Sequence, residues 1–150
     1  MHKPIAAAAL AIALCAAPAV AQPGSPNTTP GTVTRIVLLH IKPGHADQFW
    51  QDVRQHQKPV YDEEKRQGIL TNYSVATKPT QDNPDDWNVA YTLTYANWAA
   101  LDNLATRTDP ITLAHYGSAA NRTAAGIARV EHSTLVATFL VRDQTVNPWK

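Results

Sequence analysis

The amino-acid sequence predicts an α+β protein, with a four-stranded antiparallel sheet and two helices on one face of that sheet. Two observations lead to this fold class. Segments whose apolar residues alternate strictly are interspersed with segments at helical spacing, in the order strand, helix, strand, strand, helix, strand. The 150 residues contain no internal repeat and are enough for one domain of ordinary size.

The first 21 residues have the features of a secretory signal peptide. Lys3 precedes an apolar run at residues 5–17, and the small residues that follow predict cleavage after Ala21. The apolar run is shorter than the ~20 residues that a transmembrane helix needs. We therefore expect an exported protein, periplasmic or secreted, that keeps no membrane segment after cleavage.

The composition of the chain beyond the signal peptide excludes several classes of function. The single cysteine, Cys15, is removed with the signal peptide, which leaves no disulfide and no thiolate. Loss of Lys3 also lowers the formal charge from +1 to zero, and a neutral chain without a basic run argues against a nucleic-acid partner. The histidines lack metal-ligand spacing, and nucleotide-binding and nucleophile-elbow motifs are absent, so we expect no metal site.

Residues 22–31 are rich in proline, glycine, serine and threonine, a composition that predicts a disordered linker. The first strand is predicted at residues 32–42. Its apolar residues occupy both alternating faces, so both faces need cover.

An amphipathic helix is predicted over residues 45–67, where apolar residues recur at helical spacing. Gly68 is expected to end it as a C-terminal cap. Pro59 lacks the N–H group for one helical hydrogen bond, which predicts a kink near Gln55.

The second half of the chain predicts a strand hairpin, two helices and a last strand, with Asn97 and the Asp109-Pro110 pair as helix starts. The folded domain is expected to span residues 32–143. Within it we expect strands at 69–77, 87–95 and 134–142 and helices at 98–105 and 109–129, followed by a polar tail at 144–150.

Right-handed crossovers arrange these elements as a ferredoxin-like βαββαβ domain, with both helices on the same face of the sheet. The opposite face then has no cover, although the first strand is apolar on both sides. Since no further chain is available, a second copy of the same sheet is the expected cover. The sequence thus predicts a homodimer in which two sheets form a shared α+β barrel.

A polar column on the 109–129 helix is the first candidate for a functional site. Its members share one helix face by their spacing: Ile111, His115, Ser118, Arg122 and Ala125. His115 is suited to acid–base catalysis, because imidazole titrates near neutral pH; the alternative is a packed, hydrogen-bonded histidine. Arg122 is suited to holding an anion, the alternative being an arginine at the surface. Ser118 is expected to line the same pocket.

Three further residues are expected to bind a substrate. Tyr61 and Glu64 extend the apolar stripe of the first helix beyond Pro59, and Tyr95 belongs to an aromatic face of the third strand. Such a face suits a flat apolar ligand, although core packing explains its rings equally well. The remaining histidines outside the strands are expected at the surface: His45, His56 and His132.

The chain resembles the dimeric α+β barrel superfamily, which contains antibiotic-biosynthesis monooxygenases, haem-degrading proteins, and small isomerases and cyclases. The resemblance is carried by RIVLLHIKPGHADQFW, YTLTYANWAALDNL and DPITLAHYG. It implies a substrate between sheet and helices, and His115 matches the histidine that ligates haem iron in the haem-degrading members. Their signature asparagine and tryptophan correspond here to Val37 and Tyr95.

These observations lead to three hypotheses about function. The first is an exported, cofactor-independent monooxygenase, isomerase or cyclase acting on a flat, partly apolar compound, with His115 and Arg122 in catalysis. The second is a non-catalytic binding protein for haem or an aromatic metabolite. The third is a dimer without any ligand, whose polar column is satisfied internally.

Overall fold

The computed structural model describes residues 27–149, so the predicted signal peptide and residues 22–26 of the expected linker lie outside the described residues. The elements in chain order are β1 (Thr28–Ile41), α1 (Ala46–Asp52), the π-helical η1 (Val53–Gln57), α2 (Lys58–Arg66), β2 (Asn72–Thr77), β3 (Val89–Tyr95), the 3-10 helix η2 (Trp98–Leu101), α3 (Leu104–Tyr116), α4 (Ala119–His132) and β4 (Ser133–Val146). Within this part of the chain, no helix has the length and apolar character needed to cross a bilayer.

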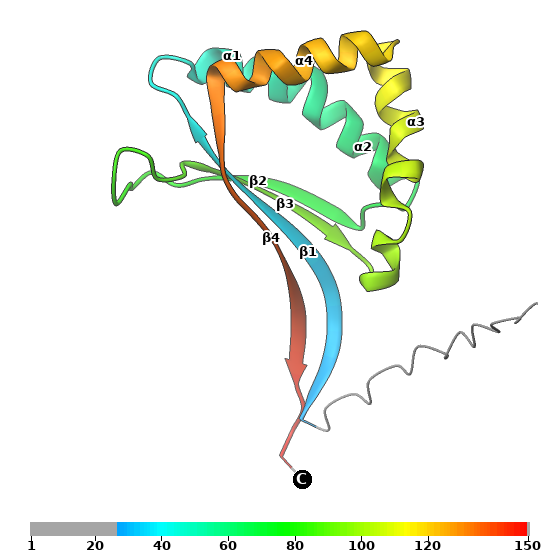
Figure 1. Cartoon of the computed structure of the whole chain (residues 1–150). Coiled ribbons are helices and arrows are strands. Elements are labelled where there is room, and N and C mark those ends of the chain that lie inside the picture. Colours follow the sequence, from blue (N-terminus) through cyan, green and yellow to red (C-terminus); the bar gives the residue numbers. More distant parts are fainter. Residues whose placement is uncertain (1–26, 150) are drawn as a thin grey trace, which may run out of the picture.

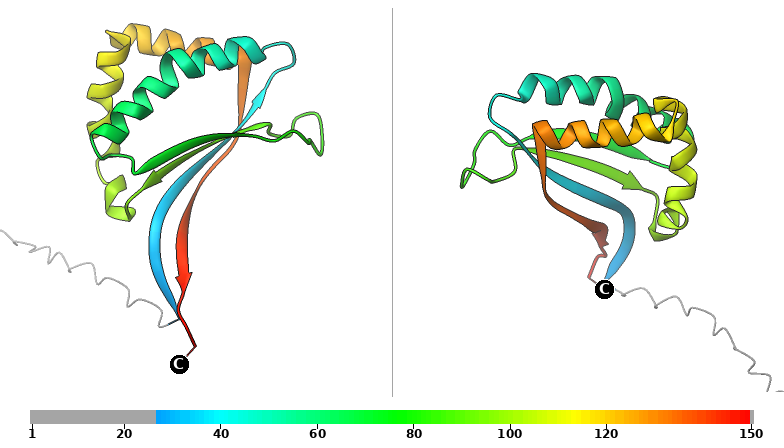
Figure 2. Two further views of the ribbon diagram at one scale, coloured as in Figure 1. Left: turned by 180° about the vertical axis from the view of Figure 1, so that it is seen from behind. Right: turned by 45° about the horizontal axis from the view of Figure 1, so that its top comes forward.

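The four strands form one antiparallel sheet in the order β2-β3-β1-β4, and the helices lie over one face of it (Figures 1 and 2). This is the predicted ferredoxin-like βαββαβ arrangement. The consecutive elements α1, η1 and α2 are called the first helical arm, and α3 and α4 the second. Phe49 and Val53 of the first helical arm pack on Val89 and Tyr91 of β3, and these contacts form the main core. The strict alternation of β3 is what supplies this apolar face.

The first helical arm is interrupted where the sequence predicts a kink. The π-helical turn at Val53–Gln57 contains Gln55 and lies directly before Pro59, which occupies the first turn of α2. Proline cannot donate the hydrogen bond that an uninterrupted α-helix would need there, and the wider turn accommodates this loss. One consequence is that His56 lies on an irregular segment of backbone.

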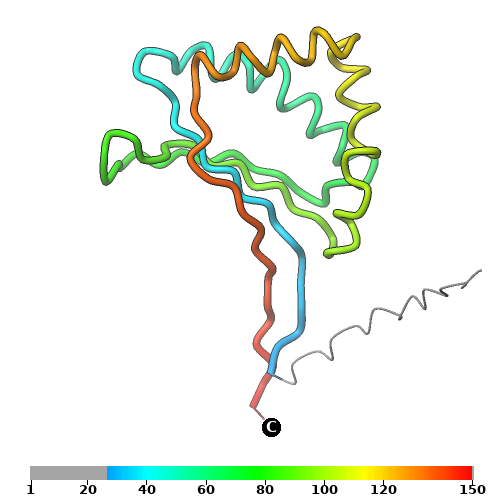
Figure 3. The backbone as a smooth tube through the Cα atoms, viewed as in Figure 1, coloured from blue at the N-terminus to red at the C-terminus, as the bar shows by residue number. Residues whose placement is uncertain are grey.

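The second helical arm differs from the prediction. The sequence predicts one helix at 109–129, whereas the structure has α3 and α4 meeting at a sharp corner at Gly117 (Figure 3). Gly117 ends α3 with a φ of 74°, a left-handed conformation that glycine adopts most readily. Ser118 caps α4, since its Oγ accepts a hydrogen bond from the N–H of Asn121 at 3.1 Å. Pro110 lies inside α3 and does not begin it.

Strands β1 and β4 both extend beyond their predicted ends and run side by side away from the body (Figure 1). Thr28 pairs with Val146 and Pro30 with Gln144, so residues 28–31 belong to a strand where a linker is expected, and residues 144–146 to a strand where a tail is expected. Composition indicates only that these residues build no core. It is the pairing of the two chain ends that satisfies their backbone groups.

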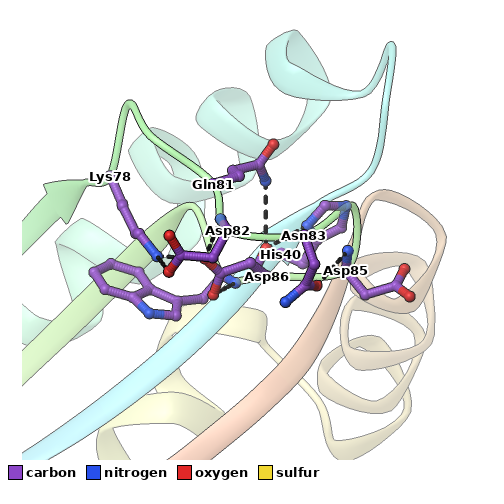
Figure 4. Close-up of polar contacts among 8 residues, drawn as sticks. His40, Lys78, Gln81, Asp82, Asn83, Asp85 and Asp86 are labelled. Carbon is purple, nitrogen blue, oxygen red and sulfur yellow. Dashed lines mark hydrogen bonds and ion pairs between the residues drawn. The ribbon is translucent and has the colours of Figure 1, made fainter.

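The loop between β2 and β3 is organised by a polar cluster around Asp86 (Figure 4). The carboxylate of Asp86 pairs with Lys78 and accepts hydrogen bonds from the backbone N–H groups of Asp82, at 3.1 Å, and Trp87, at 2.8 Å. Its backbone carbonyl accepts a hydrogen bond from Nδ1 of His40 at 2.7 Å. The hydrogen bond from Lys78, followed by those from the backbone, holds the pKa of Asp86 below its ordinary value. The cluster therefore gives His40 a structural role.

Replacement of Ser118 tests whether this residue acts as a cap. We expect Ser118→Ala to lower the free energy of unfolding by about 1 kcal/mol, because the N–H of Asn121 loses its acceptor. Ser118→Asp should retain most of the stability, since aspartate is an equally good cap. Urea titration followed by circular dichroism measures both. Equal stability of Ser118→Ala and the unmodified protein would contradict the capping role.

Candidate functional site

A cleft of about 270 Å³ lies between the sheet and the helices α1 and α4, and we call it the helix–sheet cleft. Its apolar wall consists of Val37, Leu39, Phe49 and Leu135, with part of Val130. Its polar lining residues are Asp52, Gln57, Tyr91, Arg129, His132 and Ser133. A cleft that combines apolar walls with polar groups is typical of sites that bind small molecules.

Two polar atoms of residues that line the cleft are buried without a hydrogen-bond partner among the described residues. They are the hydroxyl oxygen of Tyr91 and Nδ1 of His132. The two residues are only 3% and 7% exposed. Leaving a buried polar group unpaired costs about 1–3 kcal/mol, so a folded protein rarely retains two of them in one place without a reason.

Burial also changes the acid–base behaviour of these two groups. It lowers the pKa of the His132 imidazole, and it raises the pKa of the Tyr91 hydroxyl. The ring of Phe49 meets His132 edge-on at 5.7 Å between centroids and accounts for part of this apolar environment. At neutral pH the site therefore holds a neutral imidazole and a protonated phenol.

An ion pair crosses the top of the helix–sheet cleft. Nε of Arg129 on α4 donates to Oδ2 of Asp52 on α1 at 2.9 Å, and the Arg129 guanidinium also donates to the hydroxyl of Tyr116. Nε2 of Gln57 donates to the same carboxylate oxygen of Asp52 at 3.3 Å. Both charged side chains are largely buried, with 29% and 15% of Arg129 and Asp52 exposed. A cation is thus held at the edge of the cleft with most of its charge compensated.

The arrangement can move a proton. Neutral His132 can accept one through Nδ1, and the Tyr91 hydroxyl can donate a hydrogen bond to an oxygen of a bound molecule. Arg129 supplies positive charge close to the tyrosine, because both residues line the same cleft. Among residues 27–149, no three His, Cys, Asp or Glu side chains gather into a possible metal site.

His115, the predicted acid or base, lies outside the helix–sheet cleft. It borders an outer groove of about 410 Å³ between α2 and α3, whose walls include Pro59, Val60, Pro110 and Ile111. Nε2 of His115 shares a hydrogen bond with Nδ1 of His56 at 3.0 Å. Burial lowers the pKa of His115, and the charges of His56 and Arg129 lower it further. An acid–base role for His115 stays a prediction, and it would apply to this outer groove.

Arg122 and Ser118 also lie outside the cleft, because the break at Gly117 divides the predicted column. Arg122 donates to Oδ1 of Asp109 at 2.9 Å and to Oγ1 of Thr112 at 3.1 Å, which ties α4 to α3 near the surface. The structure therefore does not bring Arg122 and His115 together as a pair. Ser118 serves as the cap of α4.

The other predicted ligand-binding residues have different surroundings. Tyr61 lines a small apolar cavity of about 170 Å³ on the other side of Tyr91. Tyr95 is only 2% exposed and packs in the core. Glu64 is 6% exposed; burial raises the pKa of its carboxyl, and Arg35 opposes that increase. Of these three, Tyr61 approaches the cleft most closely, through its neighbour Tyr91.

None of the three histidines expected at the surface is fully exposed, and His45 is half-buried. His132 is buried in the cleft, and His56 is half-buried against Tyr116, with 5.1 Å between their ring centroids. A sequence signal for His132 exists: Arg129 and His132 are the next two members of the column that contains Arg122 and Ala125. The helical spacing that groups Arg122 with Ala125 therefore also reaches Arg129 and His132 in the cleft.

The surroundings of His115 do not fit an axial haem ligand. Its Nε2, the nitrogen that would coordinate iron, is engaged by His56 at 3.0 Å, and the outer groove beside it contains Glu63. Haem binding would have to break the histidine pair. We therefore derive no function from haem.

No protein-family model matches the chain, and comparison with curated proteins gives no match. Solved structures share the fold at low identity. HapK from Hahella chejuensis is 12% identical with a TM-score of 0.49, over 79% of this chain and 97% of that one. A dimeric ferredoxin-like protein from an uncultured marine organism is 16% identical with a TM-score of 0.44, over 81% and 100%. A DABB family protein with a ferredoxin-like fold from Mesorhizobium loti is 11% identical with a TM-score of 0.46, over 78% and 99%.

Similarity at this level carries no argument about function. What the structure itself defines is a ferredoxin-like α+β protein with an apolar cleft between sheet and helices. The function therefore has to be argued from that cleft.

The two histidines with lowered pKa make the stability depend on pH. The unfolded chain binds a proton at each imidazole near pH 6.5, whereas the folded protein resists protonation of His115 and His132 until a lower pH. Stability is therefore fully present above about pH 6.5 and is lost as the pH falls below that value. We expect a lower urea midpoint at about pH 5.5 than at about pH 7.5. His132→Leu should reduce this difference, and an unchanged pH dependence in His132→Leu would refute the assignment.

Proposed function

We propose that this protein binds a small, flat, largely apolar compound in the helix–sheet cleft. There it removes a proton from one atom of the compound and returns it to another. The observation that carries this proposal is the pair of unpartnered polar atoms, Tyr91 Oη and His132 Nδ1, buried at one apolar-walled cleft. A phenol or a β-dicarbonyl compound has the complementary chemistry, an acidic hydrogen next to an oxygen that becomes negative.

The proton step needs only groups of this chain. His132 Nδ1 accepts a proton from an acidic O–H or C–H of the ligand, and the electron pair stays on the ligand as a phenolate or enolate. The Tyr91 hydroxyl donates a hydrogen bond to the anionic oxygen, and the nearby Arg129 stabilises it further. Return of the proton to a different atom of the same ligand completes an isomerisation.

A non-catalytic binding protein is the second candidate. The guanidinium of Arg129 already pairs with Asp52 and donates to Tyr116, so only part of its charge is available to a ligand anion. Binding of the neutral form of an aromatic compound, without proton transfer, would need no more than this. The signal peptide predicted from residues 1–21 would place either activity outside the cytoplasm.

The two candidates differ in the form of the ligand that is bound. We use 4-nitrophenol, whose phenol and phenolate absorb at different wavelengths, at about pH 6, where the free compound is largely protonated. Bound phenolate is expected if His132 takes the proton, and His132→Leu should remove that signal. Tyr91→Phe should weaken binding about 5- to 10-fold through loss of one hydrogen bond.

Arg122→Gln is the matched control, because Arg122 lies outside the cleft. It should leave both the affinity and the spectrum unchanged. Bound phenol without phenolate would favour the binding protein. If Tyr91→Phe and His132→Leu bind 4-nitrophenol as well as the unmodified protein does, the cleft is not the site.

We propose in addition that the protein is a homodimer. The sheet face opposite the helices carries paired apolar residues, Ile36 beside Phe139 on neighbouring strands, and Val141 follows Phe139 on the same face. Phe139 and Val141 are 45% and 38% exposed in the single chain. An apolar sheet face of this kind is seldom left in contact with water.

The dimer is tested by multi-angle light scattering at micromolar concentration, where we expect twice the mass of the chain. Phe139→Glu should give the monomer, because it places a charge within the covered face. Leu113→Glu, at a residue of α3 that is 37% exposed, is the control and should remain dimeric. A monomeric unmodified protein would overturn the proposal.

A further inference from the structure

We infer that the ligand is an amphipathic anion, whose charged group binds Arg35 in a groove continuous with the helix–sheet cleft. This inference deepens the proposed function and rests on it for the position of the apolar part of the ligand. We call the second space the strand groove. It has a volume of about 520 Å³, and its walls include Arg35, Val37, Leu135, Thr138 and Leu140.

The strand groove and the helix–sheet cleft are neighbours. Val37 of β1 and Leu135 of β4 line both of them. On β1, Arg35 and Val37 point to the same face because they are two residues apart. Val37 pairs directly with Tyr91 on β3, and Arg35 pairs with Leu93. Arg35 and Tyr91 are therefore diagonal neighbours on one face, about 7–8 Å apart at their backbones, a distance that an arginine side chain can cover.

The guanidinium of Arg35 has no hydrogen bond or ion pair with another described residue. It differs in this from Arg129 and Arg122, both of which pair with aspartates. Arg35 is half-buried on β1, in the second strand from the edge of the sheet. A partly buried guanidinium without a partner is unusual, because its five N–H donors lose water without gaining acceptors.

One acidic group lies close enough to influence Arg35, and it does not neutralise it. Glu64 on α2 forms no ion pair with Arg35. Burial also raises the pKa of the Glu64 carboxyl, which weakens it as a competitor for the cation. The guanidinium of Arg35 is thus available to bind an external anion. A carboxylate matches its planar fork with two parallel hydrogen bonds.

Apart from Arg35 and Thr138, the residues that line the strand groove are apolar: Val37, Leu135, Phe139 and Leu140. Leu135 is 58% exposed and Leu140 is 40% exposed, although both belong to the helix-side face of β4. A ligand extending from Tyr91 toward Arg35 would cover these leucines. The combination of a cation at one end, apolar walls and a tyrosine with a histidine at the other describes an aromatic compound that carries a carboxylate.

Two fluorescent probes of the same shape test this inference. They are 8-anilinonaphthalene-1-sulfonate, which is an anion, and N-phenyl-1-naphthylamine, which has the same rings and no charge. Both become fluorescent on any apolar surface, so the difference between their affinities is the measurement. Arg35→Met keeps the length of the side chain and removes its charge, and Arg35→Lys keeps the charge.

We expect the anion to bind more tightly than the neutral probe, and Arg35→Met to weaken the anion about tenfold while changing the neutral probe less than twofold. Arg35→Lys should retain most of the affinity. Arg54→Met, at an exposed residue of η1, is the matched control and should change neither probe. Raised salt should weaken the anion alone.

Equal effects of Arg35→Met on both probes would mean that Arg35 contributes only packing, and no effect on either would mean that the strand groove takes no anion; both outcomes overturn the inference. Circular dichroism confirms that each variant is folded.

Failure of the inference is distinguishable from failure of the proposed function. The 4-nitrophenol experiment depends on Tyr91 and His132, and it can succeed or fail without reference to Arg35.

Discussion

The ion pair between Asp52 and Arg129 is the contact on which the candidate site depends. It joins α1 to α4, two helices that approach each other above the sheet, and it is largely removed from water. Losing one member of such a buried pair leaves an unpaired charge and costs about 3–5 kcal/mol. The pair therefore fixes the distance between the two helices. That distance sets the size of the helix–sheet cleft and holds His132, three residues after Arg129, against Phe49.

The same arginine links the cleft to the outer groove. Arg129 donates to the hydroxyl of Tyr116, whose ring packs against His56 and His115 with centroid distances of 5.1 and 4.8 Å. A contiguous set of side chains thus runs from the histidine pair to the edge of the cleft. The set crosses the corner at Gly117, so the break in the second helical arm is what places Tyr116 and Arg129 side by side.

The sheet presents a different constraint. Strands β1 and β4 carry apolar residues on both faces, and the helices of one chain can cover only one of those faces. Strand β4 lies at the edge, and its exposed apolar residues include Leu135 and Leu140 on the helix side and Phe139 on the other. The two sides have different explanations in the proposals above: a second sheet covers one, and an amphipathic ligand covers part of the other.

Much of the architecture was predictable because it rests on local patterns. The period-two alternation identified β3, the kink before Pro59 coincides with the π-helical turn, and the order of elements defines the ferredoxin-like arrangement. The corner at Gly117 was also readable, since a glycine followed by a serine is a common end-and-start signal for helices. The polar column that continues through this pair predicts one uninterrupted helix instead.

The sequence by itself determined the order of the elements and the face of each that turns inward, because both follow from residue spacing along a single segment. Only the tertiary structure decided which polar residues meet. Asp52 and Arg129 are 77 residues apart, and nothing in either local segment specifies the other as its partner. The same holds for the burial of His132 and for the unpaired side chain of Arg35. Each depends on how segments that are distant in the sequence pack against one another.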